Sequence, residues 1–317
     1  MRLFNSFKLI TLFLIVSLGT AGATDRKPSD FTIKNNTTIS IFNNFSLDHV
    51  NSKILNAVIV IHGVARNADE YFDYALTSAV QEKVAHQTLI VAPHFKIDSD
   101  PLKPAELYWQ ESWKFGDLSH IETVSSYEVV DKLIEHIVSK DYFPNLKKLT
   151  IIGHSAGGQF VARYAAGSQS LSNPSPSLFF VVANPSSYLY FSAERWVEPH
   201  GFSIPNTDCK DFDSYPYGTL KRNNYMNQTS VRDLEKRFNS RNVFLLLGEE
   251  DHLTDYLDTS CEANLQGKDR FDRGITYFRF LKTFFPESRV NLRTIKNVGH
   301  SGEEMIQSAE AKKILFH

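Results

Sequence analysis

A serine set between two glycines is the first feature of the sequence that could carry out chemistry. Residues 150–160 read TIIGHSAGGQF, so Ser155 lies two residues after Gly153 and two before Gly157. An apolar run precedes this group, and residues typical of a helix follow it. A serine on a sharp turn from strand to helix needs small neighbours, and such a turn lifts the hydroxyl above the sheet. The pattern predicts a nucleophile at Ser155; a plain glycine turn that happens to hold a polar residue is the alternative.

Two backbone amides are expected to serve this serine as an oxyanion hole. The N–H of Ala156 would lie at the start of the helix, where partial positive charge favours an anion. A second donor is expected from the loop after an early strand, where the sequence reads IHGVARN. In that loop Gly63 permits close approach of the backbone, and the N–H of Val64 is the expected donor. Asn67 is expected to hold the shape of the loop through its side chain.

The serine hydroxyl also needs a positioned base, because it is a weak nucleophile near neutral pH. His300 stands out among the histidines because it lies in a glycine-lined loop, NVGHSG, just beyond the last predicted strand. The orienting acid is expected after the preceding strand, and Asp251 follows the glycine that ends it. The competitors in the same loop are Glu249, Glu250 and Asp255. The chain order serine, acid, histidine is one in which catalytic triads are found.

The elements that must position these groups alternate along the chain. Short apolar runs lie at residues 57–61, 88–92, 149–152, 178–183 and 243–247, and residues 290–295 alternate like a strand near a sheet edge. Such runs indicate parallel strands that are covered on both faces. Residues 31–42 indicate a hairpin or two edge strands. Helical patterns lie at residues 124–139 (with Ser125 or Ser126 as cap), 159–166 and 267–285. The alternation predicts an α/β fold with a mostly parallel central sheet flanked by helices.

Two intervals are too long to be simple connections. Residues 95–122 contain Trp109 and Trp113, and residues 185–242 contain Tyr188. Long segments in a compact domain are usually binding loops or lids. We therefore expect inserted cover loops, with residues 185–242 as a lid or cover, and we expect these three aromatic residues to contact substrate. Packing of the same side chains in the core is the alternative.

The first 23 residues have the pattern of an export signal. Arg2 and Lys8 give a basic start, an apolar stretch follows at residues 9–18, and Ala21-Gly22-Ala23 is suited to cleavage after Ala23. A retained membrane anchor is the alternative, but ten residues are too few to span a bilayer, which takes roughly 20 helical residues. We expect a secreted or periplasmic protein with no stable membrane anchor, and a single domain at residues 24–317.

Composition and cysteine usage narrow the possible functions. A net charge of −2 argues against nucleic-acid binding, and nothing in the sequence demands more than a monomer. The only two cysteines, Cys209 and Cys261, predict a disulfide in an exported protein, with two free thiols as the alternative. Such a bond would tie the long insertion to the acid-bearing loop. No phosphate-binding glycine loop and no cluster of ligands at metal spacing is found, so neither a metal nor an organic cofactor is expected.

Several stretches resemble the α/β-hydrolase superfamily from about residue 57 to the C-terminus. HGVARNADEYF and GHSAGGQFVARYA are similar to its polyhydroxybutyrate-depolymerase-like and feruloyl-esterase-like branches, and NPSSYLY, LDTSCEANLQGKDRFDRG and VGHSGEEM resemble a group of exported hydrolases. The resemblance implies the α/β-hydrolase fold, with the nucleophile at Ser155, the acid at Asp251 and the base at His300. We expect a secreted serine hydrolase that cleaves carboxylic esters through an acyl-enzyme. The alternatives are a peptidase or amidase with the same triad, and a non-catalytic binding protein on a hydrolase scaffold.

Overall fold

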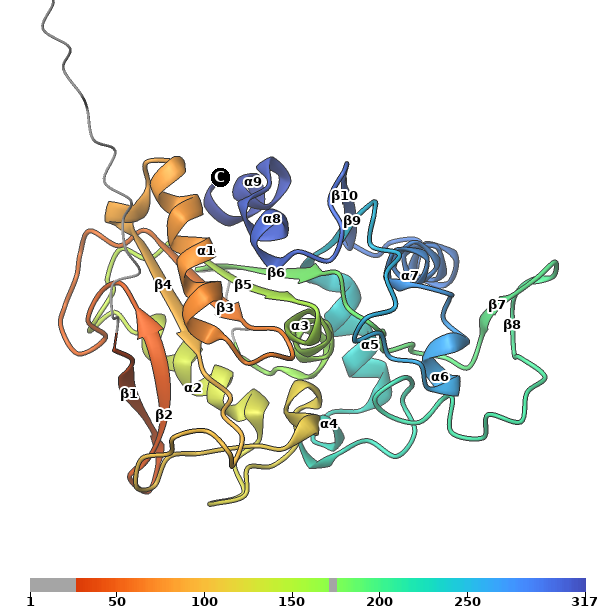
Figure 1. The fold of residues 1–317 in the computed structure, drawn as a ribbon, viewed down its shortest axis with the longest axis horizontal. Coiled ribbons are helices and arrows are strands. Elements are labelled where there is room, and N and C mark those ends of the chain that lie inside the picture. Colours follow the sequence, from red (N-terminus) through yellow and green to blue (C-terminus); the bar gives the residue numbers. More distant parts are fainter. Residues whose placement is uncertain (1–26, 171–175) are drawn as a thin grey trace, which may run out of the picture.

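The computed structural model describes residues 27–170 and 176–317, and Figure 1 shows their fold. The predicted signal segment and its cleavage site lie outside the described residues. Within the two described stretches, no helix combines the length and the apolar character needed to traverse a membrane.

An eight-stranded sheet forms the centre of the fold, in the order β1-β2-β4-β3-β5-β6-β9-β10. The six strands from β4 onward in that order run parallel: β4 (Thr88–Pro93), β3 (Asn56–Ile61), β5 (Lys148–His154), β6 (Ser177–Ala183), β9 (Asn242–Gly248) and β10 (Asn291–Ile295). An antiparallel hairpin of β1 (Ser29–Lys34) and β2 (Thr37–Asn43) joins the edge formed by β4. The predicted mostly parallel sheet, the hairpin and the edge position of the last strand are confirmed.

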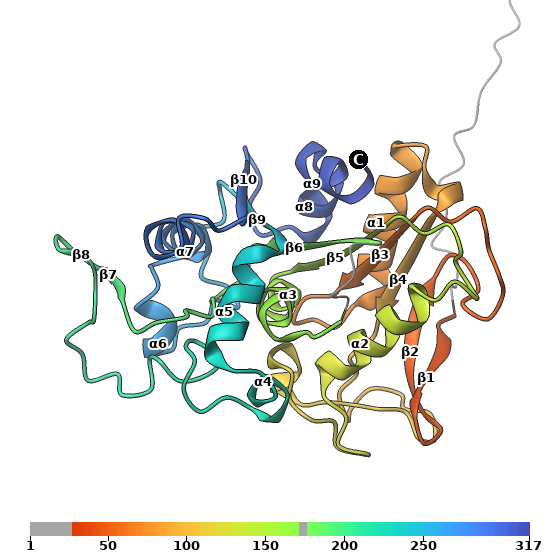
Figure 2. The ribbon, with the colours of Figure 1, turned by 180° about the vertical axis from the view of Figure 1, so that it is seen from behind.

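Helices cover both faces of the sheet (Figures 1 and 2). Val58 and Val60 of β3 belong to a core cluster with side chains of α1 (Ala68–Gln81), α8 (Gly302–Gln307) and α9 (Ala309–Phe316). Ala57 and Ile59 belong to the other cluster, which includes side chains of α2 (Ser126–Ile137), α3 (Ala156–Gly167), α5 (Val231–Ser240) and α7 (Arg270–Phe284). Successive residues of a strand point to opposite faces, so an unbroken apolar run fills both layers.

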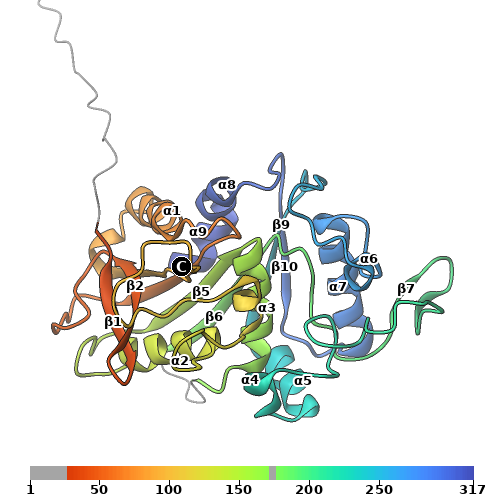
Figure 3. The same cartoon turned by 60° about the horizontal axis from the view of Figure 1, so that its bottom comes forward.

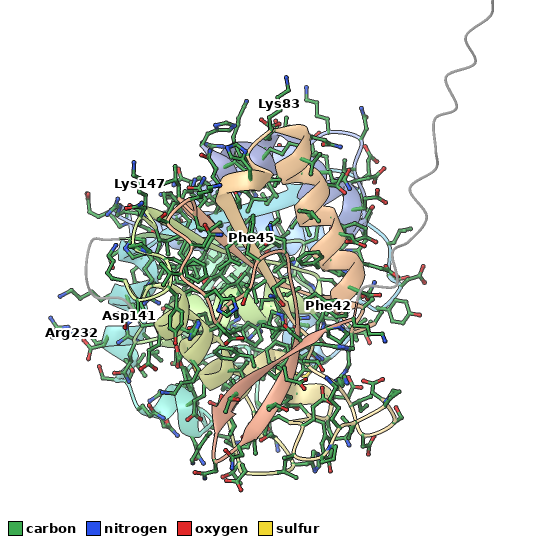
Figure 4. All side chains as sticks on the ribbon, turned by 90° about the vertical axis from the view of Figure 1, so that its left-hand side faces the viewer. Phe42, Phe45, Lys83, Asp141, Lys147 and Arg232 are labelled. Atoms are coloured by element: carbon green, nitrogen blue, oxygen red, sulfur yellow. A yellow bond between two sulfur atoms is a disulfide. The ribbon has the colours of Figure 1, made fainter. Side chains whose placement is uncertain are left out.

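The hairpin and α1 close one side of the sheet, as Figure 4 shows from that side. Phe42 of β2 is buried in the same cluster as Phe72 and Ala75 of α1. This packing matters for the site because α1 begins directly after the loop that holds Val64.

At the start of α2, Ser125 forms a capping box with Glu128, so Ser125 rather than Ser126 is the cap.

Residues 185–242 form an ordered segment beside α7. The segment contains α5, a two-stranded hairpin of β7 (Arg195–Val197) and β8 (Gly201–Ser203), and the single turn α4 (Asn224–Asn227). The hairpin projects at one end of the molecule (Figure 3). Tyr190 packs against Tyr277 and Phe280 of α7. The predicted disulfide is present and joins Cys209 to Cys261, the first residue of α6 (Cys261–Asn264).

Candidate active site

The structure brings Ser155, His300 and Asp251 together in one chain of hydrogen bonds. The Ser155 Oγ lies 2.9 Å from His300 Nε2, and His300 Nδ1 lies 2.8 Å from Asp251 Oδ2. An ionised carboxylate only accepts hydrogen bonds, so Nδ1 carries the imidazole proton and Nε2 is left to accept from the hydroxyl. The arrangement can therefore receive the proton of the serine when its oxygen attacks an electrophile.

Parallel strands place these three residues at one edge of the sheet. Ser155 follows β5, Asp251 follows β9 and His300 follows β10. The carboxyl ends of parallel strands meet at the same edge, where α/β proteins bind their ligands. Of the four acidic candidates, Asp251 is the one that contacts the histidine. Glu249 instead accepts a hydrogen bond from Thr294 of the neighbouring strand.

The backbone at Ser155 takes a conformation that few residues adopt. Its φ is 58° and its ψ is −118°, between the end of β5 and the start of α3. A Cβ atom on Gly153 would lie 2.1 Å from the carbonyl oxygen of Gly157, and one on Gly157 would lie 2.2 Å from that of Ile61. Both flanking glycines are thus required by close packing of backbone on backbone. Gly158, which the G-x-S-x-G pattern does not include, is restricted in the same way, because a Cβ there would lie 2.5 Å from the Ala183 carbonyl oxygen.

A buried arginine, which the sequence analysis did not single out, compensates the charge of the acid. Arg270 is fully buried, and its Nη1 lies 3.4 Å from Asp251 Oδ1. Its guanidinium also donates to the carbonyl oxygens of Leu253 and Asp255, in the loop that follows the acid. Burial lowers the pKa of Arg270, and the neighbouring carboxylate opposes that effect. The position of Arg270 as the first residue of the helix after the acid loop is the signal in the sequence that could have identified it.

Asn184 connects the acid strand to the histidine loop, and the sequence analysis also missed it. Its side-chain oxygen accepts from the N–H of Gly248 at 2.9 Å, and its Nδ2 donates to the carbonyl oxygen of Gly299 at 3.0 Å. The residue is fully buried and has a φ of 43°. Asparagine tolerates this left-handed region better than most residues. The side chain therefore fixes the spacing between the two loops that carry Asp251 and His300.

The two histidines that flank the site have structural partners. His62 Nε2 accepts from the N–H of Phe95 and its Nδ1 bonds to the following carbonyl oxygen, while burial lowers the pKa of His62 to about 3. His154 Nδ1 lies 2.8 Å from the hydroxyl of Tyr71, and burial holds its pKa well below the ordinary value. The lowered pKa makes both rings poor proton acceptors, and the hydroxyl of Ser155 is hydrogen-bonded to His300, which is therefore the base.

The expected oxyanion donors lie beside the serine. Val64 and Ala156 line the same cavity as Ser155. The loop that carries Val64 is anchored by Arg66, whose guanidinium donates to four backbone carbonyl oxygens, those of Phe95, Lys96, Trp109 and Gln110. The expectation that Asn67 holds this loop is wrong, because its side chain donates to Glu70 within the first turn of α1. The long, charged side chain of Arg66 reaches across to the neighbouring loop, whereas the shorter side chain of Asn67 stays within the first turn of α1.

Two cavities flank Ser155 and share Val64 and Tyr256 in their walls. The first, of about 360 Å³, extends toward α3 and is lined among others by Lys114, Phe115, Gln159, Ser186 and Tyr217. The second, of about 390 Å³, extends toward α1 and is lined among others by Tyr71, Tyr74, His154 and His300. The arrangement leaves space on both sides of the nucleophile for the two halves of a substrate.

The prediction that Trp109, Trp113 and Tyr188 contact substrate is wrong, because all three side chains are buried in the core. The Trp109 indole donates to the carbonyl oxygens of two loop residues. Trp113 stacks on Phe95 and Tyr188 stacks on Tyr277. These aromatic rings anchor their segments in the core, while other side chains of the same segments lie outside it. Lys114 and Phe115 of the short helix η2 (Glu111–Phe115) reach the cavity instead.

The parallel sheet, its helical layers and the serine turn define the α/β-hydrolase fold, as comparison with solved structures shows. Poly(aspartic acid) hydrolase-1 from Sphingomonas sp. KT-1 matches with a TM-score of 0.66 at 20% identity, over 92% of this chain and 98% of that chain. The poly(3-hydroxybutyrate) depolymerase LpqC from Bordetella parapertussis matches with a TM-score of 0.62 at 21% identity, over 93% and 96%. No protein-family model and no curated protein matches the sequence. The expected resemblance to this superfamily is confirmed at the level of the fold.

Proposed function

We propose that this protein is a serine hydrolase that cleaves carboxylic esters. The observation that carries the proposal is the hydrogen-bonded chain from Ser155 through His300 to Asp251, set on a strained turn between two cavities. The solved structures of similar fold include hydrolases, which agrees with the proposal without identifying a substrate.

The first half of the proposed reaction forms an acyl-enzyme. The Oγ of Ser155 attacks the ester carbonyl carbon while Nε2 of His300 takes the hydroxyl proton. The N–H groups of Val64 and Ala156 hold the resulting oxyanion, and losing one such donor typically costs about a hundred- to a thousandfold in rate. Asp251 orients the imidazole and stabilises its charged form. The intermediate then collapses, and His300 returns the proton to the departing alcohol.

The second half regenerates the enzyme with water. His300 takes a proton from a water molecule as the water oxygen attacks the acyl carbon. The same amides hold the second oxyanion, and its collapse returns the proton to Ser155 and releases the acid. Apart from this water, every step uses groups of the chain itself, and the proposal includes neither a metal nor a cofactor.

We further propose that the protein is secreted or periplasmic, with residues 24–317 as a single domain after cleavage at Ala23. The apolar segment at residues 9–18 and the Cys209–Cys261 disulfide support this location. Disulfides form and persist in oxidising compartments outside the cytosol. Residues 185–242 supply Ser186 and Tyr217 to a cavity wall, and their role as a cover stays a prediction.

A paired assay tests the reaction class. Wild-type protein and Ser155→Ala would be compared on 4-nitrophenyl hexanoate and on the matching hexanoyl 4-nitroanilide. The proposal predicts Ser155-dependent cleavage of the ester and much slower cleavage of the anilide. Comparable kcat/KM on both would favour the peptidase or amidase alternative, and inactivity on both would favour the binding protein.

A further inference from the structure

The cavity on the α3 side of Ser155 contains an ammonium group without a carboxylate partner. Lys114 lines this cavity, and its side chain is half-buried. Its Nζ donates to the carbonyl oxygen of Glu111 at 3.3 Å and lies 5.0 Å from the centre of the Phe115 ring. Among the ion pairs of residues 27–170 and 176–317, none includes Lys114. An ammonium in this position keeps donors available to a ligand.

Neighbouring arginines add to the positive charge around this cavity. Arg163 is fully buried, packs against Phe115, and donates only to neutral acceptors, which are the carbonyl oxygens of Pro216, Gln159 and Ser187 and the Ser187 hydroxyl. Arg66 likewise donates to four carbonyl oxygens. Within the part of the chain that the structure describes, no carboxylate contacts either guanidinium directly, and Glu111, Asp100 and Asp98 act on Arg66 electrostatically without such contact.

Two acidic groups face Lys114 from a greater distance. Glu111 and Asp258 act on it electrostatically, while Arg163 and Arg66 oppose them. Asp258 is already bound, because its carboxylate accepts from the hydroxyl of Tyr217 and from the N–H of Ser260. Of the residues that line the cavity, Lys114 and Asp258 carry charge, and Asp258 is already bound, so the ammonium of Lys114 is the charge left available, which favours an anionic ligand.

The position of His300 indicates which half of the substrate enters this cavity. In the proposed reaction, His300 gives its proton to the departing alcohol, so the alcohol must lie on the side of the imidazole. His300 lines the cavity toward α1, together with Tyr71 and Tyr74. The acyl half is then left to the cavity toward α3, which contains Lys114.

We propose that Lys114 binds a carboxylate carried by the acyl half of the substrate, so that the enzyme selects esters of dicarboxylic acids over esters of plain fatty acids. This inference rests on the proposed ester hydrolysis. A charge-assisted hydrogen bond in a half-buried site is stronger than one between neutral groups. The flexible stem of lysine can follow acyl chains of different length.

A matched pair of substrates tests the subsite. 4-Nitrophenyl hexanoate and the mono-4-nitrophenyl ester of adipic acid have six-carbon acyl chains that differ in a terminal methyl or carboxylate. Lys114→Met is expected to lower the ratio of kcat/KM for the adipate ester to kcat/KM for the hexanoate ester about tenfold or more. Lys114→Arg should recover most of the adipate activity. Lys140→Met, at an exposed lysine that donates to Pro144, is the control and should change neither value.

Equal losses on both esters, or no loss on either, would overturn the subsite; the melting temperature of each variant shows that it is folded. Calorimetry on an inactive variant measures substrate binding separately from ester hydrolysis. Ser155→Ala should bind monomethyl adipate more tightly than methyl hexanoate, and Lys114→Met in that background should remove the difference. If the wild type binds the esters but hydrolyses neither of them, the hydrolase proposal is contradicted and the subsite is not. If the hexanoate ester is hydrolysed but Lys114 has no effect on the preference between the two esters, the subsite is contradicted and the hydrolase proposal is not.

Discussion

The guanidinium of Arg270 lies 3.4 Å from the carboxylate of Asp251, and both side chains are fully buried. The same guanidinium binds the carbonyl oxygens of Leu253 and Asp255, so one side chain holds both the acid and the loop that follows it. That loop continues into Tyr256, which lies in the walls of both cavities. Arg270 thus couples the orientation of the acid to the shape of the site.

Removing this arginine is expected to cost both stability and activity. Arg270→Met would leave Asp251 as an uncompensated buried charge, which typically costs about 3–5 kcal/mol of the free energy of unfolding. Urea denaturation measures that loss, and ester hydrolysis measures the fall in kcat. The control is Lys132→Met, which breaks an exposed pair with Glu135 and should cost less than about 1 kcal/mol. A variant as stable as this control would contradict the role given to Arg270.

Asn184 is expected to act on the rate more than on substrate binding. Asn184→Ala removes the hydrogen bonds to Gly248 and Gly299, which fix the acid loop against the histidine loop. We expect kcat to fall about tenfold or more while KM stays within about threefold, because neither bond touches a cavity wall. Asn145→Ala, which removes an exposed bond to Ser52, should change neither constant. A rise in KM at constant kcat would show that Asn184 shapes the binding site instead.

Two glycines near the site should respond to different degrees to the same added methyl group. A Cβ at Gly158 would lie 2.5 Å from the carbonyl oxygen of Ala183, whereas one at Gly299 would have no neighbour closer than 3.5 Å, the carbonyl oxygen of Glu250. Gly158→Ala should therefore lower the free energy of unfolding by about 1–3 kcal/mol. Gly299→Ala should leave stability nearly unchanged. Equal stability of the two variants would argue against the close packing of α3 on β6.

The preference for an acidic acyl group should disappear at alkaline pH. Burial lowers the pKa of Lys114 below its ordinary value of 10.5, with Arg163 and Arg66 acting in the same direction and Glu111 and Asp258 against it. Attraction for a carboxylate requires the charged form, so it is complete below the lowered pKa and is lost as the pH rises through it. The ratio of kcat/KM for the adipate and hexanoate esters should thus fall before an ordinary lysine would titrate. A ratio that stays constant to pH 11 would contradict this behaviour.

The parts of the fold and site that were predictable have local signals in the chain. The strands β3, β4, β6 and β9 each contain an unbroken apolar run, and the glycines around Ser155 are required by the turn itself. Helix α1 was not predictable from the apolar pattern, because its buried face includes the small residues Ala68, Ala75 and Ala79, whose apolar signal is weak. Nor were the short helices α8 and α9 predicted.

The missed site residues depend on contacts between distant segments. Asn184 is separated by 64 residues from Gly248 and by 115 from Gly299, so its bridging role follows only from the order of the strands. Trp109 and Trp113 were misassigned because an aromatic residue in a long loop can face either the core or a cavity. Lys114 follows Trp113 in the short helix η2. Successive residues of this helix point in different directions, so Trp113 is buried whereas Lys114 lines the cavity.

Reaction with a fluorophosphonate probe tests most directly whether the hydroxyl at position 155 is an activated nucleophile. Folded wild-type protein should be labelled stoichiometrically, and mass spectrometry should place the adduct on the peptide that contains Ser155. Ser155→Ala should take up no label, and His300→Ala should be labelled far more slowly because the hydroxyl has lost its base. Absence of labelling in correctly folded wild-type protein, or a label on another residue, would contradict the account.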